Sequence, residues 1–272
     1  MTSSAFGGKH IVVTGGSSGI GQAAAWRFAK LGAQVTIIAR REDPLAATAS
    51  AAPAAGRIHA VSADVTDRVR LEAAIESAER HYGTPDLLLC CAGTARAGYF
   101  GELRDGDFHE AMDTNYFGTL HAVQAVLPAM CDRGSGHLVL VGSGAALLGL
   151  FGYTAYGPSK FAVRGLAESL RAELAHSGVR VSIVYPPDVD TPQLAAENRT
   201  KPSELRAVVG ATEIWSADQV AERLIRGVVK GSFVIPCGGT ITGLLYGHSI
   251  LAPGLFRLFD RRAARARKEI RS

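Results

Sequence analysis

Short apolar segments rich in β-branched residues alternate with longer segments of mixed polarity along most of the chain. The apolar segments have the length and composition of buried strands and lie at His10–Thr14, Gln34–Ala39, Arg57–Ala63, Asp86–Cys91, His137–Val141, Val179–Tyr185 and Phe233–Ile235. The longer segments favour helices and lie at Ile20–Leu31, Thr66–Tyr82 (with Thr66 as its expected cap), Phe108–Arg133, Tyr156–His176 and Ser216–Val229. This alternation predicts an α/β fold in which a single doubly wound parallel sheet is covered by helices on both faces.

No linker rich in Pro, Gly and Ser divides the 272 residues, so we predict a single domain over residues 1–272 with its core at about 9–235. Residues 188–210 connect a strand to a helix and carry Pro192, Pro202 and many polar side chains. A connection of this length in a compact domain is usually functional, and we interpret it as a substrate lid. Residues 238–272 form an extension, first apolar and then rich in Arg, whose apolar part is too interrupted to predict a membrane-spanning helix.

The charge of the chain is concentrated at its C-terminal end. The net charge is +4, from 29 basic and 25 acidic residues, and residues 261–272 alone hold six basic groups and one acidic group. The rest of the chain is therefore close to neutral, which argues against a nucleic-acid-binding face. The basic end is typical of either a solvated helix end or a peripheral contact with an anionic membrane surface, and the sequence leaves both open.

The four cysteines do not form a disulfide framework, because Cys90 and Cys91 are adjacent and the other two are isolated. There is no CxxC pair and no His/Cys cluster with zinc spacing, so we expect no metal. The N-terminal residues lack the charged start and apolar run of a signal peptide. Together these features predict a cytoplasmic protein, either in solution or peripheral at the cytoplasmic face of the membrane.

A glycine-rich turn follows the first predicted strand and opens directly into a helix. It has the sequence TGGSSGIG over Thr14–Gly21. Glycine lets the backbone turn sharply and approach a pyrophosphate, while the start of a helix supplies unpaired N–H groups and the positive end of its dipole. We therefore predict a dinucleotide-binding turn here, with an ordinary tight turn as the alternative.

The end of the second predicted strand indicates which dinucleotide is bound. An acidic residue at this point would hold the ribose of NAD, but the chain has Arg40 and Arg41 there. A guanidinium forms paired, charge-assisted hydrogen bonds with a 2′-phosphate, so we favour NADP(H), with two surface arginines as the alternative. Asp64, after the third strand, is expected either beside the adenine ring or as a cap for the next helix.

Ser143, Tyr156 and Lys160 have the spacing of a catalytic set. Ser143 ends the fifth strand, Tyr156 follows 13 positions later, and Lys160 lies one helical turn beyond it on the same face. The pKa of a phenol in a model peptide is about 10, and we expect the nearby ammonium to lower it toward neutrality. Tyr156 would then exchange a proton with the substrate oxygen that Ser143 orients.

These motifs, over about residues 9–235, resemble those of the short-chain dehydrogenase/reductase superfamily, which implies a Rossmann fold of about seven strands. The resemblance implies that Tyr156 is the general acid or base and that Ser143 orients the substrate. It also implies that Lys160 binds the nicotinamide ribose and that Asn115 completes a water-linked proton relay. The cofactor-binding residues that it implies are Gly15, Ser17, Ser18, Gly19, Ile20, Arg40, Asp64, Val65, Gly93, Tyr156, Lys160 and Thr191.

Two further stretches narrow the resemblance to the 3-ketodihydrosphingosine (3-dehydrosphinganine) reductases. They are residues 149–170 around Tyr156, and the run YPPDVDTP at Tyr185–Pro192 with the later ENRTKP at Glu197–Pro202. The resemblance implies NADPH-dependent reduction of the 3-keto group of 3-ketosphinganine to sphinganine, a step of sphingolipid biosynthesis, with the tyrosine as general acid. Two alternatives stay open. One is a reductase or dehydrogenase for another hydrophobic ketone or alcohol of the 3-oxoacyl, steroid or retinoid type, and the other is a non-catalytic NADP(H)-binding sensor.

A long-chain amino ketone requires an apolar channel. We expect its walls to come from Leu147, Leu148, Leu150 and Phe151 before Tyr156, and from the apolar segment Leu244–Phe259. Packing of these residues in the core or between subunits is the alternative. The sequence does not choose between Asp188 and Glu197 as the partner of the substrate ammonium. By resemblance, pairing through the helices that contain Asn115 and Lys160 would give a dimer or a tetramer.

The chain departs from the superfamily pattern after the fourth predicted strand. The superfamily has Asn-Asn-Ala-Gly there, whereas this chain has Cys90-Cys91-Ala92-Gly93. Bracing of the sheet by those asparagines is therefore absent, but Gly93 still lets the backbone approach a cofactor.

Overall fold

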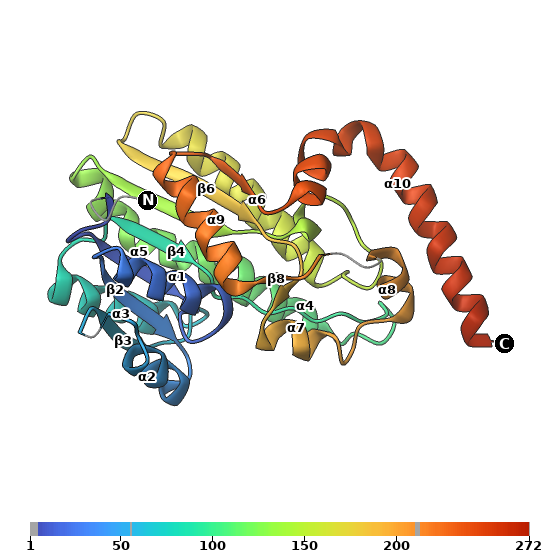
Figure 1. Ribbon diagram of the computed structural model, residues 1–272, viewed down its shortest axis with the longest axis horizontal. Helices are drawn as coiled ribbons and strands as arrows, with labels where there is room; N and C mark the ends of the chain where they lie inside the picture. Colours follow the sequence, from blue (N-terminus) through green and yellow to red (C-terminus); the bar gives the residue numbers. More distant parts are fainter. Residues whose placement is uncertain (1–4, 55, 210–212, 272) are drawn as a thin grey trace.

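The computed structural model describes residues 5–54, 56–209 and 213–271. Within these ranges one sheet holds seven strands in the order β3-β2-β1-β4-β5-β6-β9, and every neighbouring pair is parallel (Figure 1). The strands are β1 (His10–Thr14), β2 (Gln34–Ala39), β3 (Ile58–Ser62), β4 (Leu87–Cys90), β5 (Gly136–Val141), β6 (Val179–Tyr185) and β9 (Val234–Pro236). The predicted doubly wound parallel sheet is confirmed.

Helices cover both faces of the sheet. One layer consists of α1 (Gly19–Lys30), α2 (Glu42–Ser50) and α9 (Ala217–Val229). The opposite layer contains α3 (Arg68–Tyr82), α5 (Gly118–Asp132) and α6 (Tyr156–Glu173). Side chains of β1 alternate between the two cores, so Ile11 and Val13 pack under the first layer and Val12 under the second. Because both faces of the sheet are buried, the strands consist of continuous apolar runs, and these runs made them easy to predict from the sequence.

The strand order reverses next to β1. The chain runs outward from β1 through β2 to β3, then crosses back to place β4 on the other side of β1. A reversal of this kind leaves a crevice at the carboxyl ends of the two central strands, where α/β proteins bind their ligands. The Cys91 N–H donates to the Thr14 carbonyl at 3.1 Å, so the segments that leave these two strands stay close together.

The predicted cap of α3 needs correction. The helix begins at Arg68, and Asp67 caps it by accepting a hydrogen bond from the Arg70 N–H at 3.1 Å. Thr66 instead donates to Asp64 Oδ1 from its N–H at 3.0 Å and from its hydroxyl at 2.9 Å. The Thr66 side chain is therefore used in the turn before the helix.

The helix predicted over Phe108–Arg133 is three consecutive helical segments. It begins earlier, as α4 (Asp105–Met112), passes through a π-helical turn at Asp113–Phe117, and continues as α5. The helix α2 was not predicted, because its run of Ala, Thr and Ser gives little contrast in polarity between its two faces.

The lid segment folds into short elements. Within residues 188–209 these are β7 (Val189–Asp190), α7 (Pro192–Glu197) and α8 (Ser203–Val209), and residue 210 lies outside the described ranges. The strand β7 pairs in parallel with β8 (Trp215–Ser216), in a second sheet apart from the main one.

The extension forms a helix that the sequence analysis did not predict, α10 (Gly239–Arg271). Its glycines and Pro253 interrupt the apolar pattern, which hides the helix from a periodicity argument. Figure 1 shows α10 in red, leaving the end of the sheet and running past α8. The Arg262 Nη1 atom donates to the Val208 carbonyl at 3.1 Å, which holds the two helices together. Among the described helices, none combines the length and apolar character needed to cross a bilayer.

Candidate active site

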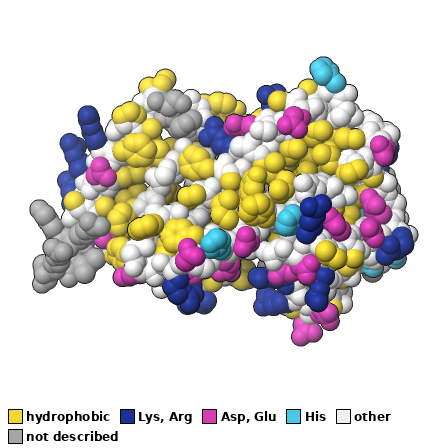
Figure 2. Space-filling model, turned by 180° about the vertical axis from the view of Figure 1, so that it is seen from behind, with side chains coloured by type: hydrophobic (Ala, Val, Ile, Leu, Met, Phe, Trp, Pro, Cys, Tyr) yellow, Lys and Arg dark blue, Asp and Glu magenta, His cyan; other side chains and the backbone are white. Residues whose placement is uncertain are grey.

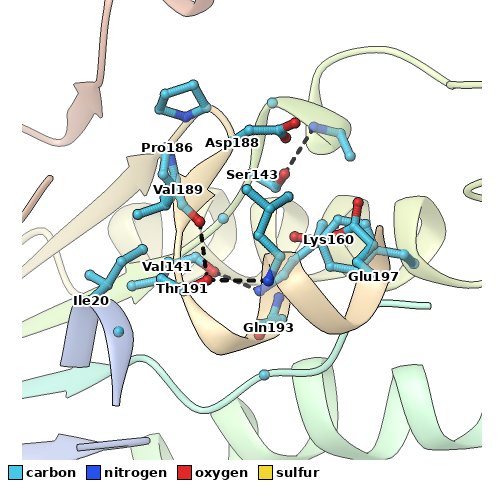
Figure 3. Close-up of a pocket in the computed structure, with 18 of the residues that line it drawn as sticks. Ile20, Val141, Ser143, Lys160, Pro186, Asp188, Val189, Thr191, Gln193 and Glu197 are labelled. Carbon is cyan, nitrogen blue, oxygen red and sulfur yellow. Dashed lines mark hydrogen bonds between the residues drawn. The ribbon is translucent and has the colours of Figure 1, made fainter. Parts of the chain in front are cut away.

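A cavity of about 560 Å³ opens at the carboxyl ends of the central strands. Its wall includes Gly15 after β1, Gly93 after β4 and Ser143 after β5, and it reaches Tyr156 at the start of α6. Figure 3 shows a close-up of this cavity, with Ile20 and Thr191 among the labelled side chains. One cavity therefore joins the glycine-rich turn to Tyr156.

The glycine-rich turn is shaped for close approach of a ligand to the backbone. Gly15 has a φ of +69°, and a Cβ there would lie 2.6 Å from the Ala92 backbone nitrogen. Gly19, which starts α1, has a φ of +54°. Ser18 precedes α1 without capping it through its side chain, so the N–H groups of the first turn stay available to an anion at the cavity. This cradle fits the pyrophosphate of a dinucleotide.

All twelve predicted cofactor-binding residues line the cavity, namely Gly15, Ser17, Ser18, Gly19, Ile20, Arg40, Asp64, Val65, Gly93, Tyr156, Lys160 and Thr191. Thr191 also caps α7, since its hydroxyl oxygen accepts a hydrogen bond from the Leu194 N–H at 3.3 Å. Their contacts with a cofactor stay predictions, but the structure brings all of them to one surface.

Arg40 and Asp64 form one rim of this surface. The Arg40 Nη1 atom lies 3.8 Å from Asp64 Oδ2, and 64% of the Arg40 side chain is exposed. The guanidinium is therefore accessible to a phosphate. Asp64 lines the cavity and accepts the Thr66 hydrogen bonds in the turn before α3. Asp67 caps this helix, so the capping alternative for Asp64 is wrong, and its position beside an adenine ring stays a prediction.

Tyr156 and Ser143 meet at the inner part of the cavity. Tyr156 is the first residue of α6 and only 8% exposed. Burial raises the pKa of its phenol, the charges of Glu197 and Asp188 act in the same direction, and a hydrogen bond with Ser143 opposes them. The Ser143 Oγ atom also accepts a hydrogen bond from the Ala145 N–H at 3.1 Å, which fixes the serine side chain at the end of β5 (Figure 3).

Lys160 points into the protein. Its Nζ atom donates to the Val141 carbonyl at 3.0 Å and lies 5.9 Å from the centre of the Tyr156 ring. Burial lowers the pKa of this lysine to about 8. We expected the phenol pKa of Tyr156 to lie below that of a free phenol, and this expectation is wrong. The phenol pKa is raised, because loss of hydration outweighs the hydrogen bond with Ser143.

Asn115 lies behind the cavity, in the π-helical turn, and is not among the residues that line it. Its side chain accepts from the Thr94 N–H at 2.8 Å and donates to the Ser159 hydroxyl at 2.8 Å. Ser159 donates in turn to the Tyr156 carbonyl at 2.7 Å. Asn115 thus ties the segment after β4 to the first turn of α6, and its place in a proton relay stays a prediction.

A buried ionic cluster stands beside Tyr156. The Tyr153 hydroxyl donates to Glu197, and Lys201 lies 2.9 Å from Glu197 and 3.4 Å from Asp188. The rings of Tyr153 and Tyr156 are 5.3 Å apart. Tyr153 and Lys201 were not predicted as site residues, although both lie in the stretches that resemble the 3-ketodihydrosphingosine reductases.

Apolar side chains form the outer part of the cavity. Leu148 and Leu150 line it as expected, whereas Leu147 packs in the main core and Phe151 contacts Tyr99 instead. The helix α10 contributes further apolar side chains, including Leu255 and Phe259. Both expected sources of the channel therefore meet at one cavity, although only part of each contributes.

Residues 9–202 match the family model described as short chain dehydrogenase. The chain is 39% identical over 270 residues to the 3-ketodihydrosphingosine reductase of Mus musculus, a match that covers 92% of this chain and 81% of that protein. It is 38% identical over 270 residues to the 3-dehydrosphinganine reductase of Danio rerio, with the same coverage of 92% and 81%.

Two solved structures show the same architecture. A short-chain dehydrogenase/reductase from Burkholderia phymatum, solved in complex with NAD, superimposes with a TM-score of 0.80 at 27% identity, covering 92% of this chain and 96% of that one. A short-chain dehydrogenase from Streptomyces avermitilis gives a TM-score of 0.78 at 26% identity, covering 93% and 97%.

Proposed function

The chain belongs to the short-chain dehydrogenase family, oxidoreductases that act on a CH–OH or C=O group and use a nicotinamide dinucleotide, and we propose that it reduces 3-ketosphinganine to sphinganine with NADPH. The observation that carries the proposal is a single cavity that joins Ser143 and Tyr156 to an ionic cluster on one side and an apolar wall on the other. A long-chain amino ketone has these parts in the same order: an amine, a carbonyl and an alkyl chain, with the carbonyl between the other two.

The protein's part in the reaction is to deliver one proton. When bound, NADPH would supply a hydride to the carbonyl carbon. The Tyr156 hydroxyl donates its proton to the carbonyl oxygen, which becomes the product hydroxyl. Burial raises the phenol pKa and so keeps Tyr156 protonated at neutral pH, as an acid in the reducing direction must be. Ser143 holds the substrate oxygen, and Lys160 contributes positive charge that favours the phenolate left behind.

Arg40 supports NADP(H) over NAD. Its guanidinium is exposed at the rim of the cavity and is only loosely paired with Asp64, at 3.8 Å. A 2′-phosphate would offer it shorter, charge-assisted hydrogen bonds. The glycine cradle and the first turn of α1 would hold the pyrophosphate, which is common to both dinucleotides.

The surfaces left exposed support two further parts of the proposal. Phe117 and Phe161 are 41% and 40% exposed on the helical layer that holds α5 and α6. Figure 2, which views the molecule from behind, shows hydrophobic side chains gathered across the middle of a face. Pairing of two subunits through these helices would cover both phenylalanines, in a dimer or a tetramer. Light scattering of the protein and of a Phe117→Ser/Phe161→Ser variant tests this part, and a monomer in the wild type would refute it.

The helix α10 supports peripheral contact with the cytoplasmic face of a membrane. Tyr246 and Ile250 are 76% and 85% exposed on it, and arginines follow toward its end. Apolar side chains beside basic ones suit an anionic lipid surface, from which a long-chain substrate would come. Flotation with anionic vesicles should carry the wild type upward, and should fail with a Tyr246→Ser/Ile250→Ser variant. Equal flotation of both proteins would count against this contact.

A substrate comparison tests the proposed reaction. NADPH oxidation by the purified protein is followed with 3-ketosphinganine, a 3-oxoacyl thioester and a steroid ketone, each dispersed in the same detergent. The proposal predicts that kcat/KM is highest for 3-ketosphinganine and that sphinganine is the product. A higher kcat/KM for either of the other ketones would overturn the proposed substrate and leave the family assignment in place.

A further inference from the structure

The ionic cluster of Asp188, Glu197 and Lys201 carries more negative than positive charge. One lysine lies between two carboxylates, with its Nζ atom 2.9 Å from Glu197 Oε1 and 3.4 Å from Asp188 Oδ2. The side chains of Lys201 and Glu197 are 5% and 7% exposed, and that of Asp188 is 31% exposed. With all three groups ionised the cluster has a net charge of −1, which is unfavourable where Lys201 and Glu197 are this deeply buried unless a further cation approaches.

The two carboxylates face the cavity and their counter-ion does not. Asp188 and Glu197 line the cavity, whereas Lys201 is not among its described lining residues. The lysine therefore neutralises part of the charge from the side away from the cavity, and the negative excess stays on the part of the wall that these two carboxylates form. Figure 3 shows the side chains of Asp188 and Glu197 around the same cavity as Ser143.

This negative wall stands next to the reacting groups. Tyr153, whose hydroxyl donates to Glu197, has its ring 5.3 Å from the ring of Tyr156. The charges of Glu197 and Asp188 reach the phenol, since both raise the pKa of Tyr156. In the proposed substrate the amino group is on the carbon adjacent to the carbonyl carbon. Any group that binds this amine must therefore lie beside Tyr156 and Ser143, where the carboxylates are.

We propose that Asp188 and Glu197 bind the protonated amino group of the substrate, and that Lys201 positions the two carboxylates for this contact. The inference rests on the proposed function and adds the basis of its selectivity: a neutral long-chain ketone would fit the apolar wall but leave the negative excess without a partner. The carboxylates thus select an amino ketone over ketones that lack the amine.

The test compares two substrates on two variants. One substrate is 3-ketosphinganine, and the other is its desamino analogue, the same hydroxy ketone without the amino group. The variants Asp188→Asn and Glu197→Gln keep side-chain size and remove the charge. Asp190→Asn is the matched control, because Asp190 lies two residues after Asp188, is exposed and does not line the cavity.

The proposal predicts that the wild type prefers the amino ketone to the desamino ketone in kcat/KM by at least about tenfold, and that each charge-removing variant loses most of this preference. The loss should lie in KM for the amino ketone, while the desamino ketone and the Asp190→Asn control keep wild-type values. An equal loss with both substrates would show that the carboxylates serve only the fold, and would overturn the proposal. Turnover of both ketones at equal kcat/KM by the wild type would also overturn it, while the proposed reaction stands. No turnover of 3-ketosphinganine at all would instead refute the proposed function.

Discussion

The Lys160 Nζ atom lies 5.9 Å from the centre of the Tyr156 ring, and the two side chains are buried together one helical turn apart. Burial moves their pKa values in opposite directions, raising that of the phenol and lowering that of the ammonium to about 8. The phenol therefore stays protonated through neutral pH, while the lysine loses its charge just above it.

This relationship predicts how reduction depends on pH. As pH rises through about 8, Lys160 deprotonates, and the positive charge that favours the phenolate is lost. We expect kcat/KM for the reduction to be flat below that pH and to fall above it. A Lys160→Arg variant keeps its charge at every accessible pH, so its residual activity should not fall in this range. An identical fall in both proteins would show that another group is titrating.

The glycine cradle predicts a defect that is specific to cofactor binding. A methyl group at Gly15 would sit 2.6 Å from the Ala92 nitrogen, in a backbone conformation with φ of +69°. We expect Gly15→Ala to weaken NADPH binding by at least about tenfold in a fluorescence titration, because the backbone must move away from the pyrophosphate. Gly101→Ala is the control, since a Cβ at Gly101 meets nothing within 4 Å. Wild-type affinity in Gly15→Ala would contradict the assignment of this turn.

The outer wall of the cavity predicts a dependence on chain length. Phe259 lines the cavity, whereas Phe256, on the same helix, is 48% exposed and does not. Loss of the Phe259 ring from the cavity wall in Phe259→Ser should raise KM for a long-chain ketone roughly tenfold, and should leave a short-chain ketone unaffected. Phe256→Ser should behave as the wild type when the substrate is dispersed in detergent. An equal effect of both substitutions would mean that α10 is not the wall of the channel.

A buried histidine predicts loss of stability in acid. His137 is 2% exposed in β5 and contacts the Ser182 hydroxyl at 2.8 Å, and burial lowers its pKa from 6.5 to about 4. The unfolded chain binds this proton below pH 6.5 and the folded protein only near pH 4. The free energy of unfolding should therefore fall by up to about 3 kcal/mol across that window as pH decreases. Denaturant titrations across this window should show a smaller fall in a His137→Asn variant, and an unchanged fall would exclude His137 as the source.

Elements with a strong local pattern were predictable. The buried strands were predicted from their apolar runs, and β1, β2 and β6 have the predicted bounds. The glycine-rich turn and the spacing of Ser143, Tyr156 and Lys160 can also be seen within short stretches of the sequence. The fold and the position of the cavity follow from such local signals.

Features that depend on packing were not predictable. The helix α10 packs beside α8, and the glycines and Pro253 in its own sequence hide the helical pattern. Leu148 lines the cavity and Leu147 does not, because neighbours in sequence point to different sides. Whether the pKa of Tyr156 is raised or lowered depends on how fully the phenol is buried. The spacing between a tyrosine and a lysine in the sequence gives no information on burial.

The most direct test of the catalytic account is the rate of a single turnover in Tyr156→Phe. The variant is loaded with NADPH, mixed with 3-ketosphinganine and compared with the wild type, with NADPH affinity measured in parallel. Removal of the phenolic hydroxyl takes away the proton donor and leaves the cavity otherwise intact. We expect NADPH affinity within about twofold of the wild type and a turnover rate at least about a thousandfold lower. A rate within tenfold of the wild type would show that Tyr156 is not the acid.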